Sequence, residues 1–394
     1  IYASLSLEGM AKFLQPALDA LGKECNTQID VHGGIATRNP EELLEIFKLL
    51  TWAKAALTDS EHIPTAELER ALQRIAPSLR TLRHANGNLV RFQGGDQGME
   101  GMLDTALAAC GIKSRNSDHL TMGYARLSAG RTSVIIDAGP PATGNASYNA
   151  HASTLAFELT SGRRPLIVSC GSGAHLGPDW HRAGRATPSH STLCLGGYSS
   201  ARLGKPVKTS GVYRELLVEA PKIVPVEMSQ TAEGVKFEGA HSGYVPPFGL
   251  THARKLSLSL DGRSLAGEDL LIALDDTAGN AGETVLSDDI NPNVDFQIRF
   301  HLHPEVDAAL DLGGTTVAIA AKSGEIWIFR HESKLSLTIE PGVYLEKNQP
   351  IPRSSRQIVL SGMVNDALTR AQWSLSKTQD TAMAIRDLRL EELR

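Results

Sequence analysis

Apolar residues recur with helical spacing in the first part of the chain, residues 1–115. One stripe with the spacing i, i+3, i+4, i+7 consists of Leu43, Ile46, Phe47 and Leu50. Asn39-Pro40 precedes this stripe, and an Asn followed by Pro and acidic residues is a typical helix start. Further helical patterns cover Leu5–Leu21, Leu68–Leu79 after Pro64-Thr65, and Met99–Cys110. We therefore predict helices throughout this part, with their apolar stripes forming a core.

Short apolar runs separated by Gly, Pro, Asn and Asp replace this pattern from about His119 onward. The runs that we predict as strands are Ser133–Ile136, Leu155–Leu159, Pro165–Val168, Ser191–Leu195, Leu256–Leu260, Leu270–Leu274, Phe296–Leu302, Thr316–Ala320, Ile326–Phe329 and Lys334–Ile339. The clearest hairpin turn is Asp261-Gly262. We expect an exposed loop at Gly279–Asp289 and a charged tail from Thr378.

These two patterns predict a multidomain protein of the α+β class. A helical domain at residues 1–115 is followed by an antiparallel β-sandwich at 120–377, because turn signals recur with the short spacing of such sandwiches. Residues 378–394 form the C-terminal tail.

The composition is that of an ordinary globular protein, with 41% hydrophobic and 21% charged residues among 394. A net charge of −5 gives no reason to expect a nucleic-acid partner, although an acidic polymer could bind to a local basic cleft. Four cysteines without a CxxC pair do not indicate a disulfide scaffold. No apolar run reaches the roughly 18 residues of a transmembrane segment. The chain begins with Ile1 rather than Met, so we expect upstream residues, including any targeting signal, to be absent from this sequence.

Candidate chemistry is concentrated in residues 145–200, which contain four of the histidines. The polar and aromatic residues of interest there are Tyr148, His151, His175, Trp180, His181, Arg182, Arg185 and His190. Imidazoles on strands can converge on one sheet face, where they bind metals or exchange protons near neutral pH. A surface loop that contains histidines by chance is the alternative that spacing alone leaves open. His301 and His303 leave a similar choice between two metal ligands and a packing role.

No Walker loop, GxGxxG fingerprint or GxSxG elbow occurs, but longer segments are informative. The central ones are NAHASTLAFEL at 149–159, GRRPLIVSCGSG at 162–173 and WHRAGRATPSHSTL at 180–193. Others are HSGY at 241–244, FGLTHAR at 248–254, DGRSLAGED at 261–269, RFHLHP at 299–304 and, upstream, GGIATRNP at 33–40. This ordered series resembles the heparinase II/III-like family. The resemblance implies a partial (α/α) toroid of helices followed by an antiparallel β-sandwich.

Enzymes of that family cleave uronate-containing polysaccharides by β-elimination. The reaction requires a neutralised uronate carboxylate, a base for the C5 proton and an acid for the leaving oxygen. The resemblance implies that Asn or His with Arg neutralises the carboxylate and that Tyr or His exchanges protons. It also implies a structural zinc in the sandwich, held by two His and one Asp.

Position by position, the match to this pattern is incomplete. His151 and His190 match the two metal-ligand histidines, whereas the expected Asp falls at Ser169, beside Cys170. The catalytic His position holds Asn149. The catalytic Tyr expected after RNP is Glu42, which on its own is read as part of a helix start.

We therefore predict a polysaccharide lyase-like protein that acts on acidic glycans such as glycosaminoglycans or alginate. Tyr148, Asn149 and Tyr244 are the predicted catalytic residues, Arg185 and His241 the predicted substrate-binding residues, and His151 and His190 the candidate zinc ligands. The alternative is a catalytically lapsed glycan-binding or cell-envelope protein of the same fold. A third hypothesis is an enzyme with altered chemistry that uses Tyr and Arg alone.

The expected location is the periplasm or cell envelope, with the cytoplasm as the alternative. A homodimer is left open.

Overall fold

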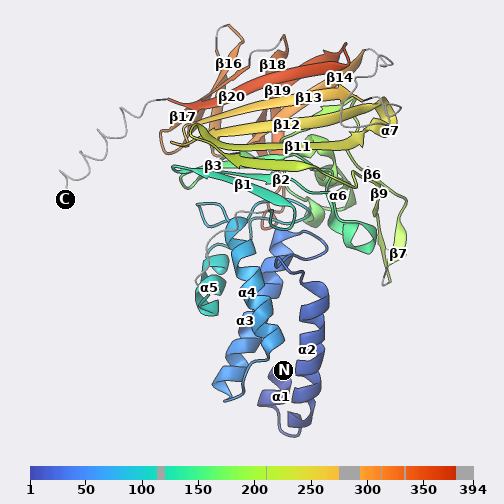
Figure 1. Ribbon diagram of the computed structural model, residues 1–394, viewed down its shortest axis with the longest axis vertical. Coiled ribbons are helices and arrows are strands. Elements are labelled where there is room, and N and C mark those ends of the chain that lie inside the picture. Colours follow the sequence, from blue (N-terminus) through green and yellow to red (C-terminus); the bar gives the residue numbers. More distant parts are fainter. Residues whose placement is uncertain (113–119, 210, 275–292, 312, 332–333, 379–394) are drawn as a thin grey trace, which may run out of the picture.

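The computed structural model describes residues 1–112, 120–209, 211–274, 293–311, 313–331 and 334–378. A helical part packs beneath two large β-sheets (Figure 1). The expected loop at Gly279–Asp289 and residues 379–394 of the expected tail lie outside the described residues. None of the described helices combines the length and the apolar character that a membrane span requires.

The helical part begins the chain and has its own core. Its α-helices are α1 (Tyr2–Ser6), α2 (Leu14–Gln28), α3 (Pro40–Asp59), α4 (Ala66–Thr81) and α5 (Met102–Cys110). The predicted start of α3 is confirmed, because the Asn39 side chain accepts hydrogen bonds from the backbone N–H groups of Glu41 and Glu42 at 2.9 and 3.2 Å. The apolar stripes of α3 and α4 face this core, with Phe47 and Leu72 fully buried.

The first sheet has the strand order β1-β2-β3-β4-β14-β19-β18, with β5 paired to β14. Its strands are β1 (Tyr124–Ala129), β2 (Thr132–Asp137), β3 (Phe157–Ser161), β4 (Arg164–Val168), β5 (Leu193–Leu195), β14 (Val294–Leu302), β18 (Ser336–Tyr344) and β19 (Arg353–Val364). All of its strand pairs are antiparallel.

The second sheet has the order β10-β11-β12-β13-β20-β17-β16-β15 and is also antiparallel. Its strands are β10 (Val226–Gln230), β11 (Gly234–Tyr244), β12 (Leu250–Ser259), β13 (Ser264–Ala273), β15 (Val306–Leu310), β16 (Thr316–Ala321), β17 (Ile326–His331) and β20 (Leu368–Lys377). The predicted Asp261-Gly262 turn joins β12 to β13. Gly262 has φ +68°, and an added Cβ would lie 2.0 Å from the Ala129 carbonyl oxygen, so this position requires glycine.

The two sheets pack face to face over one shared core. Phe157 of the first sheet stacks on Trp373 of the second with ring centroids 5.6 Å apart, and Phe300 contacts the same Trp edge-on at 4.7 Å. Two small ribbons, β6 (Arg202–Leu203) with β9 (Leu217–Glu219) and β7 (Val207–Thr209) with β8 (Val212–Arg214), project beside the helical part (Figure 1). The predicted combination of helices with antiparallel sheets is therefore confirmed.

Strand β2 explains how the two parts are joined. All six of its residues are buried, whereas β12 alternates between buried and partly exposed positions. Val134 and Ile136 face the core between the sheets, and Ile135 between them belongs to the helical core. A strand covered on both faces needs a continuous apolar run, which is why this segment lacks alternation in the sequence. The helices thus cover the outer face of the first sheet.

Candidate functional site

A cleft opens between the start of α3 and the loops that precede and follow β3 and β4. One hollow of about 410 Å³ is lined by Glu42 of α3, by Asn149 at the end of the turn η2 (Gly144–Asn149) and by His175 of η3 (Ala174–Leu176). A second hollow of about 340 Å³ adjoins it and shares the lining residues Glu41, Glu45, Asp96 and Lys347. We call these two hollows together the cleft. Its walls come from both the helical part and the sheets.

Asn149 lines this cleft, and Tyr148 contacts its lining residue Glu42. The Tyr148 hydroxyl donates to Glu42 Oε1 at 2.5 Å, and the Thr37 hydroxyl donates to the other carboxylate oxygen at 2.6 Å. The Arg214 guanidinium lies over the Tyr148 ring, 4.4 Å from the ring centroid. Burial, followed by the hydrogen bond to Glu42, raises the pKa of Tyr148 to about 12. At neutral pH this phenol is protonated, so it can donate a proton but cannot accept one as a base.

Arg185, predicted to bind substrate, is directed into the protein instead. It ends α6 (Pro178–Arg185) and is 2% exposed. Its guanidinium donates to three backbone carbonyls, those of Ser147, Ala150 and Glu215, at 2.7–2.8 Å. Burial lowers its pKa to about 10, which still leaves it charged at neutral pH. The structure corrects the expectation that Arg185 faces a ligand carboxylate: it holds the turn that carries Tyr148 and Asn149.

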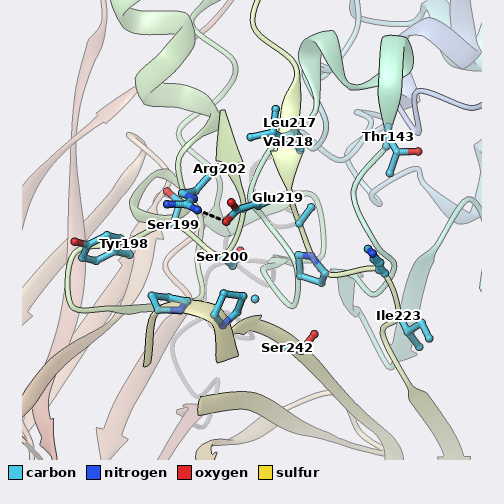
Figure 2. Close-up of a pocket in the computed structure, with 18 of the residues that line it drawn as sticks. Thr143, Tyr198, Ser199, Ser200, Arg202, Leu217, Val218, Glu219, Ile223 and Ser242 are labelled. Carbon is cyan, nitrogen blue, oxygen red and sulfur yellow. Dashed lines mark hydrogen bonds and ion pairs between the residues drawn. The ribbon is translucent and has the colours of Figure 1, made fainter. Parts of the chain in front are cut away.

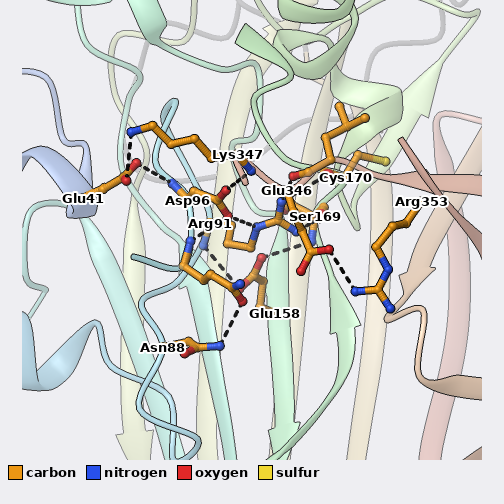
Figure 3. A network of polar contacts seen from close by, with 12 residues as sticks. Glu41, Asn88, Arg91, Asp96, Glu158, Ser169, Cys170, Glu346, Lys347 and Arg353 are labelled. Atoms are coloured by element: carbon orange, nitrogen blue, oxygen red, sulfur yellow. Dashed lines mark hydrogen bonds and ion pairs between the residues drawn. The ribbon is translucent and has the colours of Figure 1, made fainter. Parts of the chain in front are cut away.

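A buried arginine also supports the floor of the cleft (Figure 3). Arg91 donates to Asp96 at 2.9 Å and to the backbone carbonyls of Ser169 and Leu345, and its guanidinium lies 4.0 Å from the Tyr344 ring centroid. Burial alone would raise the pKa of Asp96, but the Arg91 charge and two backbone N–H donors outweigh it and lower this pKa. Asp96 is therefore a carboxylate in the cleft floor, held in place from below.

An exposed ion pair crosses the cleft above Asp96. The Lys347 ammonium lies 3.1 Å from Glu41 Oε1, and the Lys347 backbone N–H donates to Asp96 at 2.7 Å (Figure 3). The Lys347 side chain is 63% exposed and that of Glu41 is 19% exposed. This pair therefore lies at the boundary with solvent, between the two hollows.

The predicted pair His151 and His190 lies beneath the cleft. Their ring centroids are 5.0 Å apart and both residues are fully buried, so the prediction that they come together is confirmed. Neither lies on a strand: His151 follows η2 and His190 follows the turn η4 (Thr187–Ser189), which corrects the expected placement on neighbouring strands. Burial lowers the pKa of His190 to about 3, and burial together with the neighbouring His190 lowers that of His151 well below its usual value. Both rings are neutral at physiological pH.

The donor set around these rings does not fit the expected zinc site. Both ring nitrogens of His151 and the Nε2 atom of His190 have no hydrogen-bond partner, which would suit a metal. However, His190 Nδ1 lies 3.2 Å from the Ser169 hydroxyl, where a carboxylate was expected. Among the described residues, no three His, Cys, Asp or Glu side chains converge in a way that could hold a metal ion. A structural zinc needs about four such ligands, so we derive no chemistry from one.

Cys170 and His301 are also engaged in the interior. The His301 ring contacts Cys170 Sγ at 3.4 Å and the Pro188 carbonyl at 2.9 Å. Burial raises the pKa of the Cys170 thiol to about 12 and lowers that of His301 to about 3. His301 therefore has the packing role rather than that of a metal ligand.

His241 and Tyr244 lie between the sheets, away from the cleft. The Tyr244 ring is fully buried, and its hydroxyl donates to the Leu193 carbonyl at 2.9 Å. His241 contacts His252 at 3.2 Å, and His252 in turn lies 2.8 Å from Asp269. The structure corrects the expectation that either residue reaches a ligand, because both are sealed by the second sheet.

Arg254 and Asp269 complete this interior network. Arg254 binds Asp269 through two nitrogens, at 2.7 and 3.1 Å, and donates to the backbone carbonyls of Leu155 and Ser191. Trp373 Nε1 donates to the second Asp269 oxygen at 2.9 Å. The network joins strand β12 to segments of the first sheet, so Arg254 of FGLTHAR and Asp269 of DGRSLAGED serve the packing of the two sheets.

A separate, larger groove is bordered by Thr143 and by Gly144 at the start of η2 (Figure 2). Its volume is about 830 Å³, and the small ribbon β6–β9 and the segment from Tyr198 to Ala201 line it. Val218 and Ile223 on its wall are 65% and 75% exposed, and its main charged pair, Arg202 with Glu219, is internally satisfied. Apolar walls of this kind suit an apolar partner better than the hydroxyl groups of a sugar.

The sequence analysis did not identify Asp96, Glu41 and Lys347 as site residues. Asp96 follows Gly94-Gly95, and Gly94 has φ +83° with its Cα against Asn149. A double glycine followed by an acid was a usable signal for a close approach of two backbones. Lys347 carried no such signal, because it reaches Glu41 across 306 residues of sequence.

Comparisons with known proteins agree with this architecture. A model of the family described as heparinase II/III-like, C-terminal, matches residues 113–377. FtsZ-localized protein C of Caulobacter vibrioides is 32% identical over 382 residues, which are 93% of this chain and 62% of that protein. The chain thus spans about three fifths of the length of this relative.

Two solved structures show the same fold. The heparan sulfate lyase HepC mutant from Pedobacter heparinus has a TM-score of 0.69 at 14% identity, covering 96% of this chain and 58% of that one. A crystal structure of heparinase III has a TM-score of 0.71 at 13% identity, covering 96% and 60%. At these identities the likeness concerns the fold alone.

Proposed function

The chain belongs to the heparinase II/III-like family, and we propose that it binds a glycan in the cleft without cleaving it by β-elimination. The fold is that of a polysaccharide lyase. The observation that carries the proposal is the engagement of Arg185 with three backbone carbonyls, because this removes the cation expected to neutralise a uronate carboxylate. Without that neutralisation the C5 proton of a uronate is not acidic enough to be removed.

The proton-transfer groups support the same proposal. Tyr148 has a pKa of about 12, keeps its proton and donates a hydrogen bond to Glu42, so it does not supply a base. Tyr244 lies between the sheets, and His151 and His190 are neutral and sealed. What remains at the cleft is a set of hydrogen-bonding groups, among them the Asn149 amide and the carboxylates of Glu42 and Asp96. Amides and carboxylates of this kind form hydrogen bonds with sugar hydroxyls.

The test separates binding from turnover. Purified full-length protein is incubated at high concentration with heparan sulfate, other glycosaminoglycans and alginate, and the ultraviolet absorbance of unsaturated uronate is recorded. We expect no absorbance increase. Binding of a glycan panel is then measured by calorimetry, and Asn149→Ala is expected to weaken it about tenfold through loss of a hydrogen-bonding side chain. Unsaturated product that disappears in Tyr148→Phe would instead establish the lyase predicted from the sequence.

We also propose that α1–α5 belong to a larger (α/α) toroid. Leu49 and Trp52 on α3 are 57% and 50% exposed, and Val31 is 74% exposed. Exposed apolar side chains such as these support packing against further helices. The periplasm or cell envelope is the proposed location, since glycan polymers are abundant there, and cell fractionation of the tagged protein tests it.

A second candidate function is assembly with other proteins. It rests on the 32% identity to the relative whose name describes it as FtsZ-localized. The apolar groove beside β6 and β9 provides a surface of suitable character. Co-sedimentation of the purified protein with FtsZ polymers tests this candidate, and Ile223→Asp should abolish co-sedimentation if that groove is used.

A further inference from the structure

We infer that the cleft selects a glycan without carboxylate or sulfate groups, namely a neutral or amino-sugar polymer. This inference rests on the proposed function and names the class of its ligand. It departs from the acidic glycans that the sequence predicted. The reasons are the charges that line the cleft and the partners to which each cation is already bound.

The lining of the cleft is acidic. Among the described residues, its two hollows are lined by five carboxylates and one ammonium group. The carboxylates are those of Glu41, Glu42, Glu45, Asp96 and Glu346, and the ammonium is that of Lys347. Four of these carboxylates are paired with a cation, so the repulsion of an anionic polymer comes mainly from the fifth, Glu42.

The cations near the cleft are already bound to partners. Lys347 pairs with Glu41 at 3.1 Å, Lys48 with Glu45 at 2.5 Å and Arg353 with Glu346 at 2.9 Å. Arg91 is buried under Asp96, and Arg214 lies against Tyr148 without lining either hollow. Recognition of a carboxylate or sulfate depends on cations that can turn toward the ligand. Among the described lining residues the one such cation is the Lys347 ammonium, and it is paired with Glu41.

Of the five lining carboxylates, Glu42 is the one that forms no ion pair within the part of the chain that the structure describes. Its two oxygens accept hydrogen bonds from the hydroxyls of Tyr148 and Thr37, which do not neutralise its charge. Glu42 and Asn149 line the same hollow and present acceptors and an amide to a ligand. Such groups suit the hydroxyl, acetamido and ammonium substituents of hexosamines, whereas they repel uronates.

The test uses four size-matched oligosaccharides and calorimetry on the full chain. They are N-acetylglucosamine oligomers, the same oligomers after N-deacetylation, and oligomers of heparan sulfate and of alginate. We expect both hexosamine ligands to bind at least about tenfold more tightly than either acidic ligand at low salt. Added salt should weaken binding of the deacetylated oligomer and leave that of the acetylated one nearly unchanged, because only the former is charged.

Variants assign the selectivity to the cleft. Glu42→Gln and Glu45→Gln should each weaken binding of the deacetylated oligomer about threefold to tenfold, and should strengthen that of the acidic ligands. Glu69→Gln is the matched control, since Glu69 on α4 pairs with Lys54 at 3.4 Å and lines neither hollow. It changes the net charge equally and should leave all four affinities unchanged.

The outcomes distinguish failure of this inference from failure of the proposed function. Tighter binding of heparan sulfate or alginate than of the hexosamines overturns the inference and leaves glycan binding standing. Effects of Glu42→Gln and Glu45→Gln no larger than those of Glu69→Gln also overturn it. If none of the four ligands binds, the proposed function itself fails.

Discussion

Two groups of charged residues in this protein have similar composition and opposite surroundings. The interior group, Arg254, Asp269 and His252, lies between the sheets with side chains 0% exposed. The cleft group, Glu41, Lys347 and Asp96, lies at the boundary with solvent, and the Lys347 side chain is 63% exposed. The interior group joins β12 and β13 to Leu155 and Ser191 near the first sheet, whereas the cleft group lines a hollow that is open to solvent. The charged residues of the recognisable motifs therefore serve packing, whereas those that line the cleft stand outside these motifs.

The largest effect should come from the interior group. Asp269→Ala leaves Arg254 without its counterion in a dry environment, and we expect the free energy of unfolding to fall by about 3–5 kcal/mol. Urea unfolding followed by circular dichroism measures it. Glu238→Ala is the control, because Glu238 pairs with Lys255 in the same sheet with side chains about half exposed, and should cost less than about 1 kcal/mol. Equal losses of unfolding free energy in the two variants would show that burial does not distinguish these ion pairs.

Arg185 links the two regions, because it is buried yet positions a turn of the cleft. Arg185→Met leaves three backbone carbonyls without their donor, and we expect a loss of about 2–4 kcal/mol in stability together with weaker glycan binding. Asn149→Ala should weaken binding without this loss of stability. Arg185→Lys should restore part of the stability, since an ammonium reaches fewer of the three oxygens. Unchanged glycan affinity in Arg185→Met would show that the turn does not need this support.

The buried histidines predict a pH dependence. The folded-state pKa values of His190 and His301 are lowered to about 3, below the ordinary 6.5, so the unfolded chain binds more protons between these values. Stability is then fully present above pH 6.5 and falls as the pH decreases toward 3, by about 2 kcal/mol per histidine at pH 5.

Urea unfolding at pH 7 and pH 5 measures this dependence. His190→Gln should reduce the difference between the two pH values, because one proton-binding group of the unfolded state is removed. His175→Gln is the control, since that ring is exposed. A difference that is identical in wild type and His190→Gln would contradict the assignment.

The smallest effect on stability should come from the cleft. Lys347→Met removes an exposed ion pair with Glu41, and we expect a change of less than about 1 kcal/mol. The same variant should alter the affinity for charged oligosaccharides, because it leaves Glu41 without its counterion. A double-mutant cycle with Glu41→Gln measures the coupling. An interaction free energy between Lys347 and Glu41 as large as that between Arg254 and Asp269 would contradict the expected weakness of this exposed ion pair.

Local features were predictable because their causes are local. Asn39-Pro40 before two glutamates gives the start of α3, since the cap needs only neighbouring N–H groups. Asp261-Gly262 gives the β12–β13 hairpin for a similar reason. The approach of His151 to His190 followed from the family resemblance and is found at 5.0 Å. Alternation and helical periodicity were sufficient for the class of each element.

The tertiary structure alone decided which polar residues face the cleft. Arg185, His241 and Tyr244 stand in motifs beside the candidate chemistry, yet each is directed into the interior by the packing of α6 or of the second sheet. Lys347 meets Glu41 across 306 residues, and Asp96 is fixed by an arginine beneath the cleft. The sequence determines where helices, strands and turns form because these depend on nearest neighbours. The side on which a polar group emerges depends on which surfaces other segments cover, and that is settled only when the helices and both sheets have packed together.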